Sequence, residues 1–177
     1  MRIVAGEFRG RQLKSPTWDG LRPTSDRLRE TLFNILGPSV RGATVLDGYA
    51  GTGAIGIEAL SRGAAAVTFV ERDPRAVKLI EANLAALGAT GVIMRAGLAD
   101  AVTRLGAQVF DLIILDPPYG DTAAAAALDA VETLVTGSTR VVVEHAARHA
   151  PPAEQSGLRL TRTVKAGDSA LSFYEHQ

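Results

Sequence analysis

The chain has 177 residues, 46% of them hydrophobic and 5% aromatic, and its 19 basic and 19 acidic side chains give a formal net charge of zero. This length and composition predict one sizeable core, and the aliphatic bias is typical of an α/β sheet. The absence of cysteine excludes disulfides and thiolate chemistry, and the three histidines lack the spacing of a metal site. Because no ligand set of this kind is evident, we expect no bound metal. No apolar stretch near the start is long enough for a signal or a membrane span, so we expect a cytoplasmic protein.

Basic residues are concentrated at the start of the chain. Residues 1–41 hold eight basic and four acidic side chains, a charge of +4, whereas the remainder holds 11 basic and 15 acidic side chains, a charge of −4. Residues 3–13 are expected to form a hairpin around two glycines, and prolines mark a loop at 16–23. This asymmetry predicts a basic arm on a neutral to acidic body, with an ordinary solvated hairpin as the alternative. The charges of the arm that we expect to contact nucleic acid are those of Arg9, Arg11, Lys14 and Arg22.

A helix is predicted next. Leu28, Leu32, Ile35 and Leu36 recur at helical spacing, and Gly37-Pro38 ends the pattern. Thr24 precedes this pattern and is the predicted cap. We expect this helix to cover the ligand-binding side of the sheet.

A short strand at 43–47, a glycine turn at 48–53 and an apolar helix at 55–60 follow. Residues 51–56 match the pattern G-x-G-x-x-G and Glu71 lies about 20 residues further on, which is the spacing of a dinucleotide site. In such a site, however, the strand usually runs directly into the first glycine, and a pyrophosphate then meets the positive end of the helix. Here Asp47 ends the strand, where its charge would repel that phosphate.

A cationic ligand resolves this conflict. S-adenosylmethionine carries an ammonium and a sulfonium group, which Asp47 would attract, and glycines at 51 and 53 allow its amino-acid part to approach the backbone closely. Glu71 ends the next apolar strand, at 66–70, where its carboxylate can accept both ribose hydroxyls. An exposed acid at a strand end is the alternative for Glu71 alone, but the order of these residues favours a site.

The remaining elements alternate between strands and helices. Asp73-Pro74 starts a helix whose core positions are Val77, Ile80, Leu84 and Leu87. Strands are expected near 92–94, 111–115 and 140–143, and a helix over 123–134. Two final strands, 158–164 and 171–174, form a hairpin. This pattern predicts a mostly parallel sheet that ends in an antiparallel hairpin.

The sequence Asp116-Pro117-Pro118-Tyr119 follows the buried strand and is the most informative motif in the chain. An aromatic amine is a poor nucleophile, and hydrogen-bond acceptors aimed at its two N–H bonds favour a more tetrahedral nitrogen. The Asp116 carboxylate and the Pro117 carbonyl are suitable acceptors, because consecutive prolines fix the backbone and offer no competing N–H. Tyr119 is suited to stack on the base. The alternative is a turn that only terminates the strand.

Together these motifs resemble those of amino-methylating Rossmann methyltransferases. The segment from Arg22 to Asn34 and the opening from Arg2 to Arg11 narrow the resemblance to the RsmD-type family of bacterial small-subunit ribosomal RNA guanine-N2 methyltransferases. The resemblance extends from Arg2 to about Tyr174. It implies a Rossmann-like class I domain at 41–177, with an RNA-facing extension of a β-hairpin and a helix at 1–40.

The resemblance also implies a function and a site. The reaction would be methyl transfer from S-adenosylmethionine to the exocyclic N2 amine of a guanine in 16S ribosomal RNA, within an assembled or partly assembled small subunit. The implied catalytic residues are Asp116, Pro117 and Tyr119; those implied to bind the cofactor are Asp47, Tyr49, Ala50, Gly51, Gly53, Glu71, Arg72, Leu98 and Asp116. The adenine contact stays open between the backbone at Leu98 and Asp100. Two other functions also remain open: adenine-N6 methylation of DNA, and a non-catalytic nucleotide-binding module.

Overall fold

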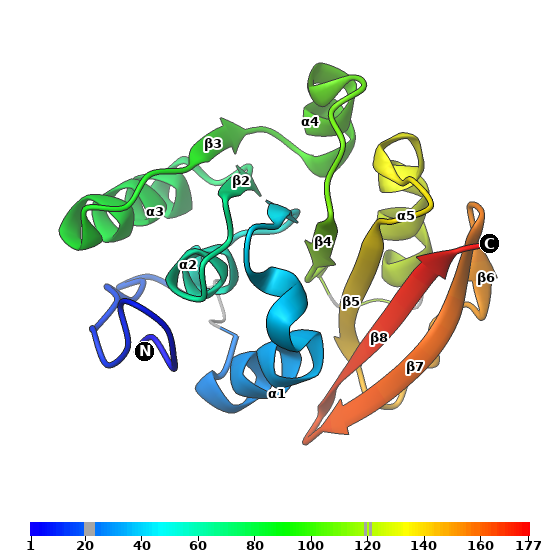
Figure 1. The fold of residues 1–177 in the computed structure, drawn as a ribbon, viewed down its shortest axis with the longest axis horizontal. Helices are drawn as coiled ribbons and strands as arrows, with labels where there is room; N and C mark the ends of the chain where they lie inside the picture. The colour runs from blue at the N-terminus through cyan, green and yellow to red at the C-terminus, as the bar shows by residue number, and fades with distance from the viewer. Residues whose placement is uncertain (20–23, 119, 121) are drawn as a thin grey trace.

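The computed structural model describes residues 1–19, 24–118, 120 and 122–177. Within these residues eight strands form one sheet in the order β3-β2-β1-β4-β5-β8-β7-β6 (Figure 1). The strands are β1 (Thr44–Asp47), β2 (Ala66–Glu71), β3 (Val92–Arg95), β4 (Leu112–Leu115), β5 (Arg140–Ala146), β6 (Glu154–Gln155), β7 (Leu158–Ala166) and β8 (Ser169–His176). The helices are α1 (Asp26–Leu36), α2 (Ala54–Ser61), α3 (Pro74–Leu87), α4 (Leu98–Leu105) and α5 (Ala123–Val131), with short 3-10 turns η1 (Gly37–Val40) and η2 (Glu132–Leu134).

The first five strands are parallel, and β8, β7 and β6 continue the sheet in antiparallel pairs. The chain adds strands outward from β1 in one direction, to β2 and β3, and later in the other, to β4 and β5. Ligands bind in open α/β sheets at such a reversal, at the carboxyl ends of the strands. The predicted fold class is confirmed, including the parallel sheet and its final hairpin.

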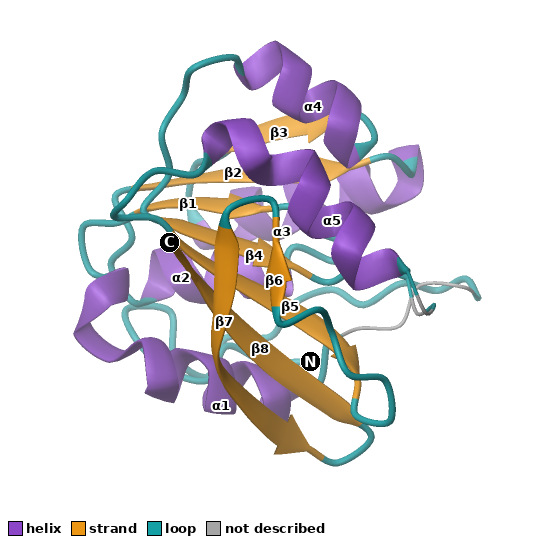
Figure 2. Ribbon diagram, turned by 90° about the vertical axis from the view of Figure 1, so that its right-hand side faces the viewer, coloured by secondary structure: helices purple, strands orange, loops and turns teal. Residues whose placement is uncertain are grey.

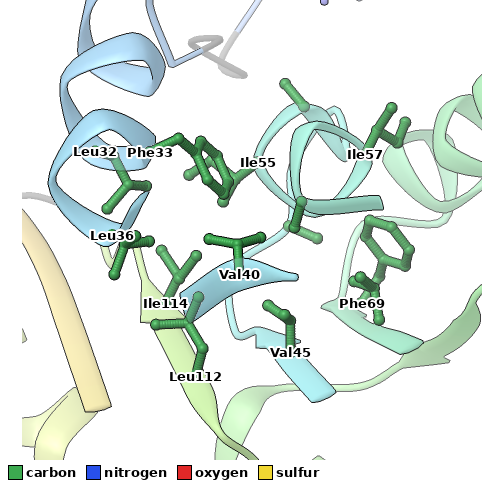
Figure 3. Packing of buried hydrophobic residues seen from close by; sticks show 14 of the residues in the cluster. Leu32, Phe33, Leu36, Val40, Val45, Ile55, Ile57, Phe69, Leu112 and Ile114 are labelled. Carbon is green, nitrogen blue, oxygen red and sulfur yellow. The ribbon is translucent and has the colours of Figure 1, made fainter. Parts of the chain in front are cut away.

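Helices cover both faces of the sheet (Figure 2). Successive side chains of a strand point to opposite faces, and β4 shows this directly. Leu112 and Ile114 belong to the hydrophobic cluster under α1, α2 and α3, whereas Ile113 and Leu115 belong to the cluster under α4 and α5. Because β4 is buried on both faces, it reads in the sequence as a continuous apolar run. Figure 3 shows the first cluster, with Phe33 and Leu36 of α1, Ile55 of α2 and Val45 of β1 among its members.

The start of α1 differs from the sequence prediction. Ser25 is the N-cap, and its hydroxyl accepts a hydrogen bond from the backbone N–H of Leu28 at 3.1 Å. Thr24, the predicted cap, lies one residue earlier and donates its hydroxyl to Asp116 at 3.2 Å. Both residue types cap helices well, so local preference did not separate them. The consequence is that the segment before α1 reaches the motif after β4.

The N-terminal arm, residues 1–14, is fixed to the body of the protein. Its two legs pair antiparallel at the bridge between Arg2 and Gln12, so the predicted hairpin connection is right, but regular strands are not formed. The backbone N–H groups of Val4 and Ala5 bind instead to the fully buried carboxylate of Glu58 on α2, at 2.8 and 3.0 Å. Gly6 lies so close to α2 that a Cβ there would be 1.8 Å from the carbonyl oxygen of Ser61.

Two further buried polar side chains hold the arm. Arg29 of α1 donates to the carbonyl oxygens of Thr24 at 2.8 Å and Arg2 at 2.6 Å. Asn83 of α3 accepts from the backbone N–H of Lys14 at 2.8 Å and donates to the carbonyl oxygen of Thr52 at 3.4 Å. The arm is therefore connected to the helix that precedes the site and to the glycine turn itself.

Most other elements match their predicted ranges to within a few residues. Asp73 caps α3 and Pro74 begins it; Ile80, Leu84 and Leu87 are buried there, whereas Val77 is only partly buried. Two elements had no clear signal in the sequence: α4, because Gly97 at its start offers no capping side chain, and the two-residue strand β6. In the described part of the chain, no helix has the length and apolar character to cross a membrane.

Candidate active site

A cavity of about 750 Å³ opens at the carboxyl ends of the parallel strands. Its walls come from the turns after β1, β2, β3 and β4, from β5, and from the segment that precedes α1. Among the residues that line it are Trp18, Thr24, Ser25, Tyr49, Ala50, Gly51, Glu71, Arg72, Leu98, Asp116, Pro117 and Glu144. The volume is in the range of ordinary small-molecule sites, and the position is the one expected for this sheet topology.

The glycine turn after β1 forms one wall. Gly51 and Gly53 have φ values of 54° and 77°, a region that L-residues with side chains rarely adopt. The N–H of Ala50 donates to the carbonyl oxygen of Val70 on β2 at 2.9 Å, which holds the turn against the neighbouring strand. Tyr49, Ala50 and Gly51 line the cavity, whereas Gly53 begins α2 behind it.

Glu71 connects the turns after β1 and β2. One carboxylate oxygen accepts the N–H of Gly51 at 2.9 Å, and the other accepts the N–H of Asp73 at 2.8 Å. A carboxylate offers about four lone-pair positions, so both oxygens can also accept hydroxyl groups of a ligand. Glu71 therefore holds the glycine turn in shape and presents acceptors to the cavity.

Asp47 lies under this turn. Its side chain is 1% exposed and accepts the backbone N–H of Gly56 at 2.9 Å. Burial raises the pKa of Asp47 to about 7, the hydrogen bond from Gly56 opposes the rise, and the negative charge of Glu71 adds to it. Of the described residues, Asp47 and Gly53 are the two predicted cofactor ligands that do not line the cavity. The structure places Asp47 beneath the glycine turn, where the hydrogen bond that it accepts from Gly56 fixes the start of α2.

The far end of the cavity is formed after β2 and β3. Arg72 and Leu98 line it, the latter at the first residue of α4. Asp100 is exposed and is not among the described residues that line the cavity. Of the two candidates for the adenine contact, the geometry therefore favours Leu98. Trp18 lies at the same cavity, and the guanidinium of Arg75 stacks 5.1 Å from the centroid of its ring. The sequence offered no periodic or motif signal for Trp18.

Asp116 and Pro117 line the opposite end. Asp116 is partly exposed at the cavity wall, and its carboxylate accepts the hydroxyl of Thr24. Burial of the carboxyl group raises the pKa of Asp116 well above its usual value, and the neighbouring carboxyl of Glu144 raises it further. Tyr119, the third predicted catalytic residue, lies outside the described residues. The structure thus brings the predicted cofactor turn and the predicted amine-binding motif into one cavity.

Glu144 is a residue that the sequence analysis did not single out. It lies in β5, is 6% exposed, lines the cavity and, through its charge, contributes to the raised pKa of Asp116. A signal was present, because Glu144 follows the apolar run Val141–Val143 just as Asp47, Glu71 and Asp116 follow theirs. Applying the same rule to every parallel strand would have found it.

The predicted RNA-binding residues lie away from this cavity. Arg9, Arg11 and Lys14 are exposed on the N-terminal arm. The guanidinium of Arg11 donates to the carbonyl oxygen of Ala86 near the end of α3, so part of its function is to fasten the arm. Arg22 lies outside the described residues. The exposed charges of the arm are therefore held in place by its hydrogen bonds to α2 and α3.

Comparison with known proteins identifies the family. A family model described as conserved hypothetical protein 95 matches residues 1–175. Ribosomal RNA small subunit methyltransferase D of Escherichia coli K12 is 33% identical over 180 residues, covering 100% of this chain and 90% of that protein. The protein of the same name from Haemophilus influenzae is 42% identical over 123 residues, covering 67% and 64%. The chain belongs to the ribosomal RNA small subunit methyltransferase D family.

Solved structures agree with this assignment. The structure of yhhF from Escherichia coli has a TM-score of 0.87 and 33% identity, and the match covers 100% of this chain and 98% of that one. A ribosomal protein L11 methylase from Lactobacillus delbrueckii has a TM-score of 0.71 at 18% identity, covering 85% and 77%, which shows a shared fold. The RsmD-type resemblance inferred from the sequence is confirmed. The protein is a methyltransferase, so the alternative of a non-catalytic module is wrong.

Proposed function

We propose that the protein transfers a methyl group from S-adenosylmethionine to the exocyclic N2 amine of a guanine in small-subunit ribosomal RNA. The observation that carries this proposal is the single cavity in which the glycine turn after β1 and the Asp116-Pro117 motif after β4 face the same space. A nucleotide-like cofactor at one end and an amine at the other would then meet in the middle. We expect the protein to act in the cytoplasm, where its substrate is found.

The residues at the first end fit the cofactor. Glu71 would accept the ribose hydroxyls while it keeps its hydrogen bonds to the glycine turn. Leu98 and Arg72 would contact the adenosine, and Gly51 would let the amino-acid part approach the backbone. Asp47, whose pKa of about 7 leaves it partly ionised at neutral pH, would be shifted to its ionised form by the positive charges of the cofactor and would stabilise them from below. When bound, S-adenosylmethionine supplies an electrophilic methyl group on a sulfonium centre.

The residues at the second end hold the amine. The Asp116 carboxylate and the Pro117 carbonyl would accept the two N–H bonds, so that the nitrogen lone pair is directed along the axis of the cavity. With the amine held by Asp116 and Pro117, the N2 nitrogen would be placed to accept the methyl group that S-adenosylmethionine supplies. The surplus proton leaves the nitrogen to water or to Asp116, whose raised pKa suits a proton acceptor. Positioning supplies most of the rate.

Two arguments support ribosomal RNA as the substrate, whereas guanine rests on the sequence resemblance. Two relatives that match the whole of this chain are named for the RNA of the small ribosomal subunit, and a third is named as a putative rRNA methyltransferase. The arm that carries Arg9 and Lys14 is built into the body beside α2, which suits a structured RNA partner more than a mobile tail would. The target base would have to be looped out or flipped, because a stacked base cannot enter such a cavity. We further propose that an assembled or partly assembled subunit is the preferred substrate.

The test is transfer of labelled methyl groups to small subunits from cells that lack this protein, followed by nuclease digestion and chromatography of the nucleosides. The expected product is a single N2-methylguanosine. Asp116→Asn should reduce the single-turnover rate by at least about 100-fold, because one acceptor is replaced by an amide that can present a donor. Asp100→Asn is the matched control, since this exposed carboxylate lies outside the cavity. Label in N6-methyladenine, or preference for duplex DNA, would reject the substrate.

A further inference from the structure

Glu144 lies at the same edge of the parallel sheet as the acids already assigned to the site. It follows the buried apolar run of β5, next to β4, and its side chain faces the end of the cavity that holds Asp116. It also borders a smaller hollow of about 20 Å³ beside Pro117 and Pro118. An acidic side chain that is 6% exposed in such a place requires a reason, because burial of a charged group is costly.

The register of β4 and β5 sets the geometry of this pair. Leu115 pairs with Val143, so Asp116 and Glu144 are the next residues along two neighbouring parallel strands. Both line the cavity, so their carboxyl groups lie on the same wall, and the negative charge of Glu144 contributes to the raised pKa of Asp116. A carboxylate offers about four acceptor positions, so each of the two can accept a donor from a ligand.

Guanine presents a matching pair of donors. Its Watson–Crick edge carries the N1–H directly beside the N2 amine, so two neighbouring acceptors can bind both. We propose that Glu144 accepts the N1–H of the target guanine while Asp116 accepts the N2 amine, which makes Glu144 the residue that selects guanine. This inference rests on the proposed function. Adenine has an unprotonated N1, which would face the Glu144 carboxyl as a second acceptor.

The test compares guanine with 2-aminopurine at the target position. 2-Aminopurine keeps the amine at C2, but its N1 carries no hydrogen. RNA is prepared with either base at the methylated position, free or assembled into small subunits as methylation requires, and single-turnover rates are measured with the full chain. The variants are Glu144→Gln, whose amide can donate to an unprotonated N1, and Glu175→Gln. The latter is a matched control, because Glu175 is exposed on β8 beside the other end of β5.

The expected result is a change in preference as well as in rate. A hydrogen bond to a charged group corresponds to a factor of about 10 to 150, so Glu144→Gln should lower the rate on guanine by that factor. Its rate on 2-aminopurine should equal or exceed that of the wild type, so the ratio of the guanine rate to the 2-aminopurine rate should fall by at least the same factor relative to the wild type. The intrinsic reactivities of the two amines cancel, because the ratio is compared between enzymes. Glu175→Gln should keep the wild-type ratio.

Each outcome has a distinct meaning. Affinity for S-adenosylmethionine, measured by calorimetry, should be unchanged in Glu144→Gln and reports that the variant is folded. If this variant does not fold, Glu144→Asp keeps the carboxyl group and should be slower while retaining the preference for guanine. A wild-type preference in Glu144→Gln, or an abolished preference in Glu144→Asp, would overturn the role of Glu144 alone. Methylation by the wild type of adenine in the native RNA, instead of guanine, would overturn the proposed function, and this inference with it.

Discussion

Replacing Asp47 with asparagine should change how the stability of this protein depends on pH. In the folded protein burial raises the pKa of Asp47 to about 7, against an ordinary value of 3.8. The folded state therefore holds this proton more tightly than the unfolded chain does. The stabilisation from the protonated group is fully present below about pH 4 and is lost as the pH rises through 7.

The magnitude follows from the size of the shift. A difference of about three pKa units, at about 1.4 kcal/mol per unit, gives about 4 kcal/mol as the stability that the wild type loses over this range. Asparagine cannot titrate, but its carbonyl oxygen can still accept the N–H of Gly56, which lies 2.9 Å from the aspartate oxygen. The free energy of unfolding of Asp47→Asn, relative to the wild type, should therefore rise by about 4 kcal/mol between pH 4 and pH 8.

Urea unfolding of both proteins at intervals of one pH unit measures this difference. Asp111→Asn is the control with the opposite sign: hydrogen bonds from Thr44 lower the pKa of Asp111, so its stabilisation is present at neutral pH and is lost in acid. A difference between the wild type and Asp47→Asn that stays within about 1 kcal/mol from pH 5 to pH 8 would show that Asp47 remains ionised. The account of its burial would then be wrong.

Two further predictions concern the ligands. Glu71→Gln should weaken the binding of S-adenosylmethionine by about 1 to 3 kcal/mol, as measured by calorimetry, because the ribose loses a charged hydrogen-bond acceptor. Tight binding of a nicotinamide dinucleotide by the unmodified protein would reject S-adenosylmethionine as the cofactor. Reversing the charges of Arg9, Arg11 and Lys14 together should depress methylation, leave cofactor affinity unchanged and reduce the salt dependence of RNA binding by about one log–log unit for each phosphate that the arm no longer binds. An unaltered salt dependence of RNA binding would mean that the arm is only structural. Thermal unfolding of the triple variant serves as a control, because it reports the stability lost with the hydrogen bond from Arg11 to Ala86.

The parts of the fold with strong local signals were predictable. The apolar run of β4, the Asp73-Pro74 start of α3 and the hairpin of the two final long strands each have a strong local signal, and each was found where predicted. The helix cap was not predictable, because Thr24 and Ser25 are both good capping residues and only contact with Asp116 separates them. The arm lacked regular strands because its backbone amides bind Glu58 of α2, a partner more than 50 residues away.

The residues of the candidate site likewise fall into those that the sequence predicted and one whose importance only the fold shows. Asp47, Glu71 and Asp116 were found from the sequence, since an acid that directly follows a buried strand has a predictable place at the edge of the sheet. Glu144 obeys the same rule, but its importance depends on β5 lying next to β4, so that the two carboxyl groups meet. Sequence alone does not state which strands are neighbours.

The sequence by itself determined the class of fold, the glycine turn after β1 and the place of the Asp116-Pro117 motif at the end of β4, because strand periodicity, glycine conformation and the position of an acid after a strand are local properties. The tertiary structure decided which acids share a cavity, which carboxylate is buried beneath the turn and which is in its wall, and how the arm is held. These depend on the order of strands in the sheet and on contacts between distant segments, such as Asn83 with both Lys14 and the glycine turn. Burial then determines the electrostatics: the acids at the ends of β1 and β4 have raised pKa values because the fold removes them from water.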